Sequence, residues 1–320
     1  MAEQALNLTS SIGAVWPPVI STNDRIKGFC DEAVITPEDA ENFATEFVHS
    51  QQDACQDASI SRVSIRTIAS LEAVRSLDEL GVPLEAAMPI KGSNDRIIVY
   101  AGWNAPERTI SEDWLQRHHK VLNQIVTASL TPQHRFIDMR PQVIDRRTSE
   151  AVKEKMIDRF VGLYAFFGYD EQDVEDLLFN PANTIAYIED DEGIVSTAMA
   201  ERATLNIKGH GQTEVAEITE AITRPSERGK GFYRAISGYL GNQLLNDRDP
   251  LDVIYGESNL AVSGVLIAAH QNGRRFSYFD RERLAVNQPA FGIIQQNFKV
   301  EDGQEDRSYN DFALSYFPLD

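Results

Sequence analysis

The second half of the chain alternates segments of helical and strand periodicity, and this order restricts the fold more than any other feature. Residues 149–167 carry apolar side chains at three- and four-residue steps, which predicts an amphipathic helix. A short helix at 173–178 and strands at 184–188 and 195–205 follow. The remaining predicted elements are a strand at 214–223, a helix at 231–245, a strand at 253–257, a helix at 261–271 and a mostly β tail from residue 291. This order predicts an α/β layout around one sheet.

A smaller α/β unit is predicted in the first half. Thr36-Pro37 begins a helix, because Thr36 can cap it and Pro37 suits its first position. The predicted elements are an extended arm at 1–20, helices at 36–52, 71–80 and 111–130, and strands at 61–68 and 96–100. Prolines at 132 and 141 mark a boundary, so we expect an N-terminal domain at 1–135, of unclear role, and a second domain at 136–320.

The chain carries a strong excess of acidic residues. Its 30 Lys and Arg stand against 49 Asp and Glu, which gives a formal net charge of −19. Such a surface repels phosphate backbones, so we expect no nucleic-acid partner. It would attract cationic small molecules such as amines, although ordinary solvation of acidic side chains explains the same composition.

Nothing in the sequence predicts a membrane span, a metal site or secretion. No apolar run reaches the roughly 20 residues that span a bilayer, and residues 1–11 lack the regions of a signal peptide. Cys30 and Cys55 permit a disulfide that nothing else indicates, and they lack zinc-ligand spacing. His118 and His119 are adjacent and would point apart on a helix. We therefore expect a soluble cytoplasmic protein without a metal.

The loop at 222–233, of sequence ITRPSERGKGFY, stands where a predicted strand ends and a helix begins. Gly229 and Gly231 allow a tight turn that brings backbone N–H groups close to a ligand. Because a helix N-terminus favours negative charge, pyrophosphate is the expected ligand. The loop is neither a P-loop nor a Rossmann loop, since GxxxxGK[ST] and the third glycine of GxGxxG are absent. A glycine-containing turn with solvated charges is the alternative.

The loop resembles the acyl-CoA pyrophosphate loop of the GNAT superfamily of N-acetyltransferases, whose pattern is Q/R-x-x-G-x-G/A. Arg228 and Gly231 match this pattern, whereas Tyr233 stands where Gly or Ala is usual and narrows the space beside the pyrophosphate.

The surrounding sequence is similar to one branch of that superfamily, the beta-lysine acetyltransferases. The similarity lies in residues 216–225 (AEITEAITRP), 255–264 (YGESNLAVSG) and 271–273 (QNG). In the first half, residues 70–73 (SLEA), 85–90 (EAAMPI) and the strand at Ile97 resemble the domain that precedes the catalytic domain in that branch.

The resemblance implies a GNAT-like mixed central sheet flanked by helices, preceded by a smaller α/β domain. It implies transfer of an acetyl or longer acyl group from acyl-CoA to an amine that attacks the thioester directly. The backbone of Ile222, Thr223 and Arg224 would hold the pantetheine, and Asn259 would bond the same arm. The pyrophosphate would rest on the backbone amides of Arg228, Gly229, Lys230, Gly231, Phe232 and Tyr233.

The amine must lose a proton, so a carboxylate near the thioester is the expected base. Glu220 and Glu217 precede the loop on one strand and are the candidates. Three residues apart, they would face opposite sides of a regular strand. A β-bulge, typical of GNAT proteins in this strand, would let both point into the cleft. The alternative for either residue is a surface carboxylate.

Many GNAT enzymes protonate the leaving thiolate with a Tyr four residues before the glycine that corresponds to Gly273. Ala269 occupies that position here, so the usual acid is missing. His270 is a poor substitute. Tyr255 and Tyr278 are candidates, although tyrosines in such positions are more often aromatic residues that pack in the sheet.

Three functions remain open at this stage. The first is an N-acyltransferase acting on a primary amine of a small cationic metabolite, with no nucleic-acid or membrane partner and a homodimer left open. The second is a non-catalytic acyl-CoA-binding or peptide-binding protein, suggested by Tyr233 and the missing acid. The third is an interaction scaffold in which the first 140 residues do the recognising.

Overall fold

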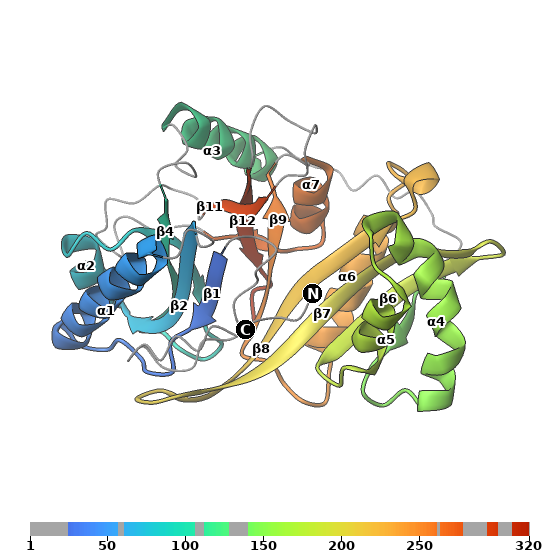
Figure 1. Ribbon diagram of the computed structural model, residues 1–320, viewed down its shortest axis with the longest axis horizontal. Coiled ribbons are helices and arrows are strands. Elements are labelled where there is room, and N and C mark those ends of the chain that lie inside the picture. Colours follow the sequence, from blue (N-terminus) through green and yellow to red (C-terminus); the bar gives the residue numbers. More distant parts are fainter. Residues whose placement is uncertain are drawn as a thin grey trace.

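In the computed structural model, the described residues are 25–56, 61–105, 112–127, 140–260, 263–277, 293–299 and 309–319. Within them the chain forms a four-stranded and an eight-stranded sheet with helices packed on both (Figure 1). The predicted fold class is therefore confirmed: a mixed central sheet flanked by helices, preceded by a smaller α/β unit. No helix of the described segments is both long and apolar enough to cross a membrane.

The smaller sheet has the strand order β1-β2-β4-β3. Its strands are β1 (Arg25–Phe29), β2 (Arg62–Ser70), β3 (Leu84–Pro89) and β4 (Arg96–Asn104). Only β1 and β2 pair in parallel. The helices α1 (Pro37–Gln56) and α2 (Leu71–Glu79) bury their apolar residues against this sheet, among them Phe43, Phe47 and Leu77. Ser70 caps α2 by accepting a hydrogen bond from the N–H of Ala73.

The larger sheet has the order β10-β12-β9-β8-β7-β6-β5, with β11 paired to β12. Its strands are β5 (Gln142–Ile144), β6 (Asn183–Asp190), β7 (Gly193–Ile207), β8 (Gly211–Thr223), β9 (Val253–Asn259), β10 (Arg275–Phe276), β11 (Ile293–Lys299) and β12 (Tyr309–Tyr316). β8 and β9 form its one parallel pair among the described strands.

Helices cover both faces of the larger sheet. α6 (Phe232–Leu245) packs on the face that carries Ala186 and Ile188. α4 (Glu150–Tyr164), its continuation η3 (Ala165–Phe167) and α5 (Glu171–Phe179) lie on the opposite face, where α4 and α5 pack against Ile185 and Tyr187. This division follows from the alternation of side chains along β6.

The two sheets share one hydrophobic core. Ile98 and Tyr100 of β4 pack with Val215 of β8, Tyr255 of β9 and Leu314 of β12. The helix α3 (Glu112–Thr127) belongs by sequence to the first half, yet it packs against α7 (Ser263–Gln271) through Leu122, Ile125 and Leu266. The predicted boundary near residue 135 stays a prediction, but the first half clearly contributes to the surroundings of the larger sheet.

Two strands of the smaller sheet were not predicted, for physical reasons. β1 contains two cations and Gly28, and β3 ends in Pro89 and carries Glu85, so neither shows apolar alternation.

Cys30 is buried and forms no disulfide. The side chain of Cys55 lies outside the described residues, as do the predicted arm and Tyr278.

Candidate functional site

The parallel strands β8 and β9 separate part-way along their length. They pair at only three positions, the last of which joins Glu217 to Tyr255. Beyond it β8 continues to Thr223 and β9 to Asn259, while β9 stays paired with β12 on its other edge. The sheet therefore opens at the carboxyl ends of two parallel strands, which is where ligands bind in open α/β sheets.

A β-bulge distorts β8 just beyond this point. Thr219 pairs with Met199 and Ile222 with Thr197, so β8 contains one residue more than β7 in this interval. The predicted bulge is confirmed and falls at Glu220 and Ala221. The side chain of Glu220 lies outside the described residues, so its proposed role stays a prediction.

The loop after β8 has the expected strand-to-helix geometry. A short 3₁₀ helix, η4 (Pro225–Glu227), leads to Gly229 and Gly231, both left-handed with φ of 78° and 93°. Residues with a side chain rarely adopt this backbone conformation, which therefore requires glycine. A Cβ on either glycine would meet nothing within 4 Å, so the space beside each glycine is open. None of the described side chains caps α6, so its first N–H groups can bind a ligand.

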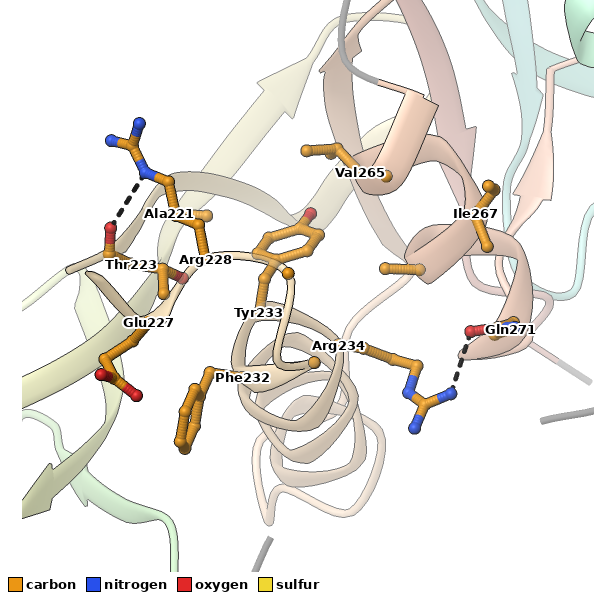
Figure 2. Close-up of a pocket in the computed structure, with 14 residues that line it drawn as sticks. Ala221, Thr223, Glu227, Arg228, Phe232, Tyr233, Arg234, Val265, Ile267 and Gln271 are labelled. Atoms are coloured by element: carbon orange, nitrogen blue, oxygen red, sulfur yellow. Dashed lines mark hydrogen bonds between the residues drawn. The ribbon is translucent and has the colours of Figure 1, made fainter. Parts of the chain in front are cut away.

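A cavity of about 620 Å³ lies between this loop, the start of α6 and α7. Figure 2 shows Tyr233 between β8 and α7, with its hydroxyl in the cavity. The lining residues are Ala221, Thr223, Glu227, Arg228, Gly229, Gly231, Phe232, Tyr233, Arg234, Gly264, Val265, Ile267, Ala268 and Gln271. Six of the predicted cofactor residues are among them; the α7 residues were not predicted.

Two side chains brace the cavity walls. The Nε of Arg228 donates to the carbonyl oxygen of Thr223 at 3.4 Å, and Nη1 of Arg234 donates to Oε1 of Gln271 at 3.1 Å (Figure 2). The second bond ties α6 to α7 across the cavity.

Three predicted cofactor residues are not among those that line the cavity, and a fourth has a side chain outside the described residues. The Ile222 side chain is in the core with α4, and its carbonyl accepts a hydrogen bond from Ser196. Arg224 pairs with Asp190 at 3.0 Å and donates its backbone N–H to Val195. Lys230 forms an exposed ion pair with Glu227. Asn259 ends β9, and its side chain lies outside the described residues.

Glu217 is held by two donors where β8 and β9 part. The Tyr255 hydroxyl donates to its Oε2 at 2.8 Å, and Nη1 of Arg66 approaches the same oxygen at 3.5 Å. Arg66 also donates to the Tyr255 hydroxyl. The Arg66 side chain is 1% exposed and that of Glu217 16%. A residue of the smaller sheet therefore fixes the carboxylate that the sequence singles out.

The electrostatics of this cluster keep Arg66 charged and Tyr255 protonated. Burial, the largest single influence, lowers the pKa of Arg66, but Tyr255, Tyr100, Glu217 and Glu257 together outweigh it and raise the pKa well above its ordinary value. Burial raises the pKa of Tyr255 well above its ordinary value, so its hydroxyl remains a donor.

Neither Arg66 nor Glu257 was predicted as a site residue from the sequence. Arg66 lies on the polar face of an alternating strand, which normally indicates solvent exposure, yet its guanidinium sits among the rings of Phe29, Tyr100 and Tyr255 at 5.4–5.9 Å.

No group of three or more His, Cys, Asp or Glu among the described residues is arranged to hold a metal.

No family model and no curated protein matches the chain. Solved structures match part of the chain. NAA60 of Arabidopsis thaliana, in complex with acetyl-CoA, is 8% identical, with 56% of this chain and 97% of that chain covered and a TM-score of 0.41.

Two bacterial N-acetyltransferases show the same kind of similarity. The Escherichia coli ribosomal-protein-S18-alanine N-acetyltransferase is 10% identical, covers 56% of this chain and 94% of that chain, and has a TM-score of 0.37. The Vibrio cholerae spermidine N-acetyltransferase is 13% identical, with 56% of this chain and 92% of that chain covered, and has a TM-score of 0.36. At these identities and TM-scores none of the similarities assigns an activity or a substrate to this chain.

Proposed function

We propose that the chain is an acyl-CoA-dependent N-acyltransferase that moves an acetyl or longer acyl group to a primary amine of a small cationic metabolite. One observation carries the proposal: the cavity adjoins both the uncapped start of α6 and the part of β8 that lies beyond its last pair with β9. A ligand that is anionic at one end and reactive at the other can occupy both places.

The residues around the cavity fit acyl-CoA as a substrate. The open space beside Gly229 and Gly231 admits a pyrophosphate close to the backbone, and the first N–H groups of α6 would bind it. The cavity volume of about 620 Å³ is within the usual range for ligand sites. Acyl-CoA supplies an activated acyl group; the chain supplies binding and proton transfer.

The carboxylates near the end of the β8–β9 ladder suit the amine. Glu220, with Glu217 second, would accept the amine's proton directly or through water. Glu217 and Glu257 both raise the pKa of Arg66. The excess of negative charge favours a cationic acceptor.

Within the N-acetyltransferases, the beta-lysine acetyltransferase branch remains our proposal. It is supported by the sequence likeness at 255–264 and 271–273. Within the second of these segments, Asn272 donates to the Arg234 carbonyl and the Ser237 hydroxyl and so fixes the end of α7 on α6.

A cytoplasmic location, the absence of nucleic-acid and membrane partners, and a homodimer stay expectations.

Thermal unfolding with CoA and a panel of acyl-CoAs tests the proposal. At about 100 times its dissociation constant, a ligand adds roughly 2.7 kcal/mol, which for a chain of this length is a rise in Tm of about 4 °C. Acylation of a panel of amines, followed by release of free thiol, then tests turnover. A chain whose Tm is unchanged by every acyl-CoA at millimolar concentration is not an acyl-CoA enzyme.

A second function is favoured by one observation, the aromatic ring of Tyr233 inside the cavity. A protein that binds acyl-CoA without turning it over would show the rise in Tm and no release of thiol with any amine.

A further inference from the structure

Arg274 is a buried cation without a carboxylate partner among the described residues. It lies between α7 and β10 and is 3% exposed. Its Nη2 donates at 3.5 Å to the carbonyl oxygen of Ser315, and its guanidinium lies 5.9 Å from the ring centre of Phe317. Its Nε has no hydrogen-bond partner in the described part of the chain. A charge that is removed from water with so little compensation is costly.

The other arginines that are buried in the described segments do have carboxylate partners. Nη2 of Arg62 lies 2.6 Å from Oε2 of Glu85, and Nη1 of Arg66 lies 3.5 Å from Oε2 of Glu217. Their charges are therefore compensated within the protein. The charge of Arg274 is left for an anionic ligand to compensate.

Gly256 lets the guanidinium reach the point where β8 and β9 separate. Gly256 and Ile218 directly follow the last ladder pair, which joins Tyr255 to Glu217. A Cβ on Gly256 would overlap Nη2 of Arg274 and lie 2.8 Å from the carbonyl oxygen of Ile218. A side chain at this position would therefore displace the guanidinium from the end of the ladder.

The cavity approaches the same point along β8. Ala221 and Thr223 are the β8 residues that line it, and Ile218 lies three positions before Ala221, roughly 10 Å along a strand. In the proposed function the pyrophosphate binds at the start of α6 and the thioester lies beyond the ladder, so the far end of the acyl group points toward the ladder. Arg274 is not among the lining residues, so only an acyl group that extends well past the thioester would reach it.

Resting on the proposed function, we propose that Arg274 is a specificity-determining residue that binds the terminal carboxylate of the acyl group, so that the acyl donor is the CoA thioester of a short dicarboxylic acid. A guanidinium can bind a carboxylate through two parallel hydrogen bonds, which are stronger than those between neutral groups. The carboxylate would in turn compensate the buried charge of Arg274. An acetyl group carries no anion that could do so.

Calorimetric binding of succinyl-CoA and butyryl-CoA to the wild-type protein gives the first test. The two thioesters have the same carbon chain and differ in ending with a carboxylate or with a methyl group. The affinity for succinyl-CoA should be about 10- to 100-fold higher, the gain expected from a hydrogen bond between charged groups.

Variants then show whether Arg274 causes this preference. In Arg274→Met, which removes the charge and keeps an unbranched side chain, the affinity for succinyl-CoA should fall to that for butyryl-CoA. Arg274→Lys keeps a charge but not the paired donors, so it should retain part of the preference. Arg234→Met, at an arginine that does line the cavity, is the matched control and should keep the ratio of the two affinities. Cooperative thermal unfolding verifies that each variant is folded.

The outcomes separate the two proposals. A wild-type protein that binds neither thioester overturns the proposed function. Equal affinity of the wild type for both thioesters, or a preference that Arg274→Met keeps in full, overturns only the role of Arg274. If Arg274→Met does not fold, Arg274→Lys decides: a reduced preference supports the role of Arg274, and an unchanged preference overturns it.

Discussion

Nη1 of Arg66 and Oε2 of Glu217 lie 3.5 Å apart, although 151 positions separate the two residues in the chain. Arg66 belongs to the smaller sheet and Glu217 to the larger, so the N-terminal half supplies part of the candidate site. The Tyr255 hydroxyl, bonded to both, completes a buried cluster at the end of the β8–β9 ladder. The orientation of the proposed base therefore depends on the packing of the two sheets.

Replacing Glu217 or Glu220 by Gln tests the assignment of the base. The rate of acyl transfer should fall about 10²- to 10⁴-fold in at least one variant, because Gln keeps the size and cannot accept the proton. The difference in rate between the variant and the wild type should shrink at high pH, where the amine loses its proton unaided. Binding of acyl-CoA, measured by calorimetry, should be unchanged. Wild-type rates and pH dependence in both variants would remove these carboxylates from the mechanism.

Arg66→Met should destabilise the protein and disorganise the cluster. Removal of one partner from a buried ion pair typically costs about 3–5 kcal/mol, since the remaining charge loses its compensation. Urea unfolding measures this loss, and Arg66→Lys should recover part of it. Lys208→Ala, which breaks an exposed ion pair with Glu32, is the control and should leave the urea midpoint near the wild-type value. Equal midpoints for Arg66→Met and the control would contradict the prediction.

Gly231→Asp places a negative charge where the pyrophosphate should bind. The affinity for acyl-CoA should fall roughly 10- to 100-fold, the equivalent of losing one charge-assisted hydrogen bond of about 1.5–3 kcal/mol. Gly168→Asp is a matched control, because Gly168 is also left-handed, with φ of 82°, has open space beside it and is not among the residues that line the cavity. Both changes carry the same backbone strain of about 1–2 kcal/mol, so a loss of acyl-CoA affinity in Gly231→Asp alone reports a change at the binding loop and not a general effect of strain.

The helices and the long strands of the larger sheet could be predicted because their apolar residues recur at regular steps. The loop at Gly229 and Gly231 was predictable because glycine spacing is a local signal. Arg66 was not, since an arginine on the polar side of a strand is usually exposed. Arg274, which precedes β10, was not predicted either, because contacts distant in sequence bury both arginines. The α7 residues of the cavity, such as Val265, were not predicted either, because only the tertiary fold places α7 beside the loop.

A pH-dependent contact joins the two sheets at the β7–β8 turn. Nη1 of Arg96 lies 3.1 Å from Nδ1 of His210 and donates to it, which requires that nitrogen to be unprotonated. Burial, followed by the charge of Arg96, holds the pKa of His210 below its ordinary value of 6.5, while Asp252 and Asp95 act in the opposite direction.

Acid should therefore destabilise the protein through His210. A histidine whose pKa is lower in the folded state binds its proton more readily when unfolded, so its contribution to stability is present above pH 6.5 and is lost as pH falls from there through the folded-state pKa. Urea midpoints at about pH 7.5 and about pH 5.5 measure this loss. In His210→Gln, which does not titrate, the difference between the two midpoints should be smaller than in the wild type. If the two proteins lose stability equally over this interval, His210 is not the group that responds to acid.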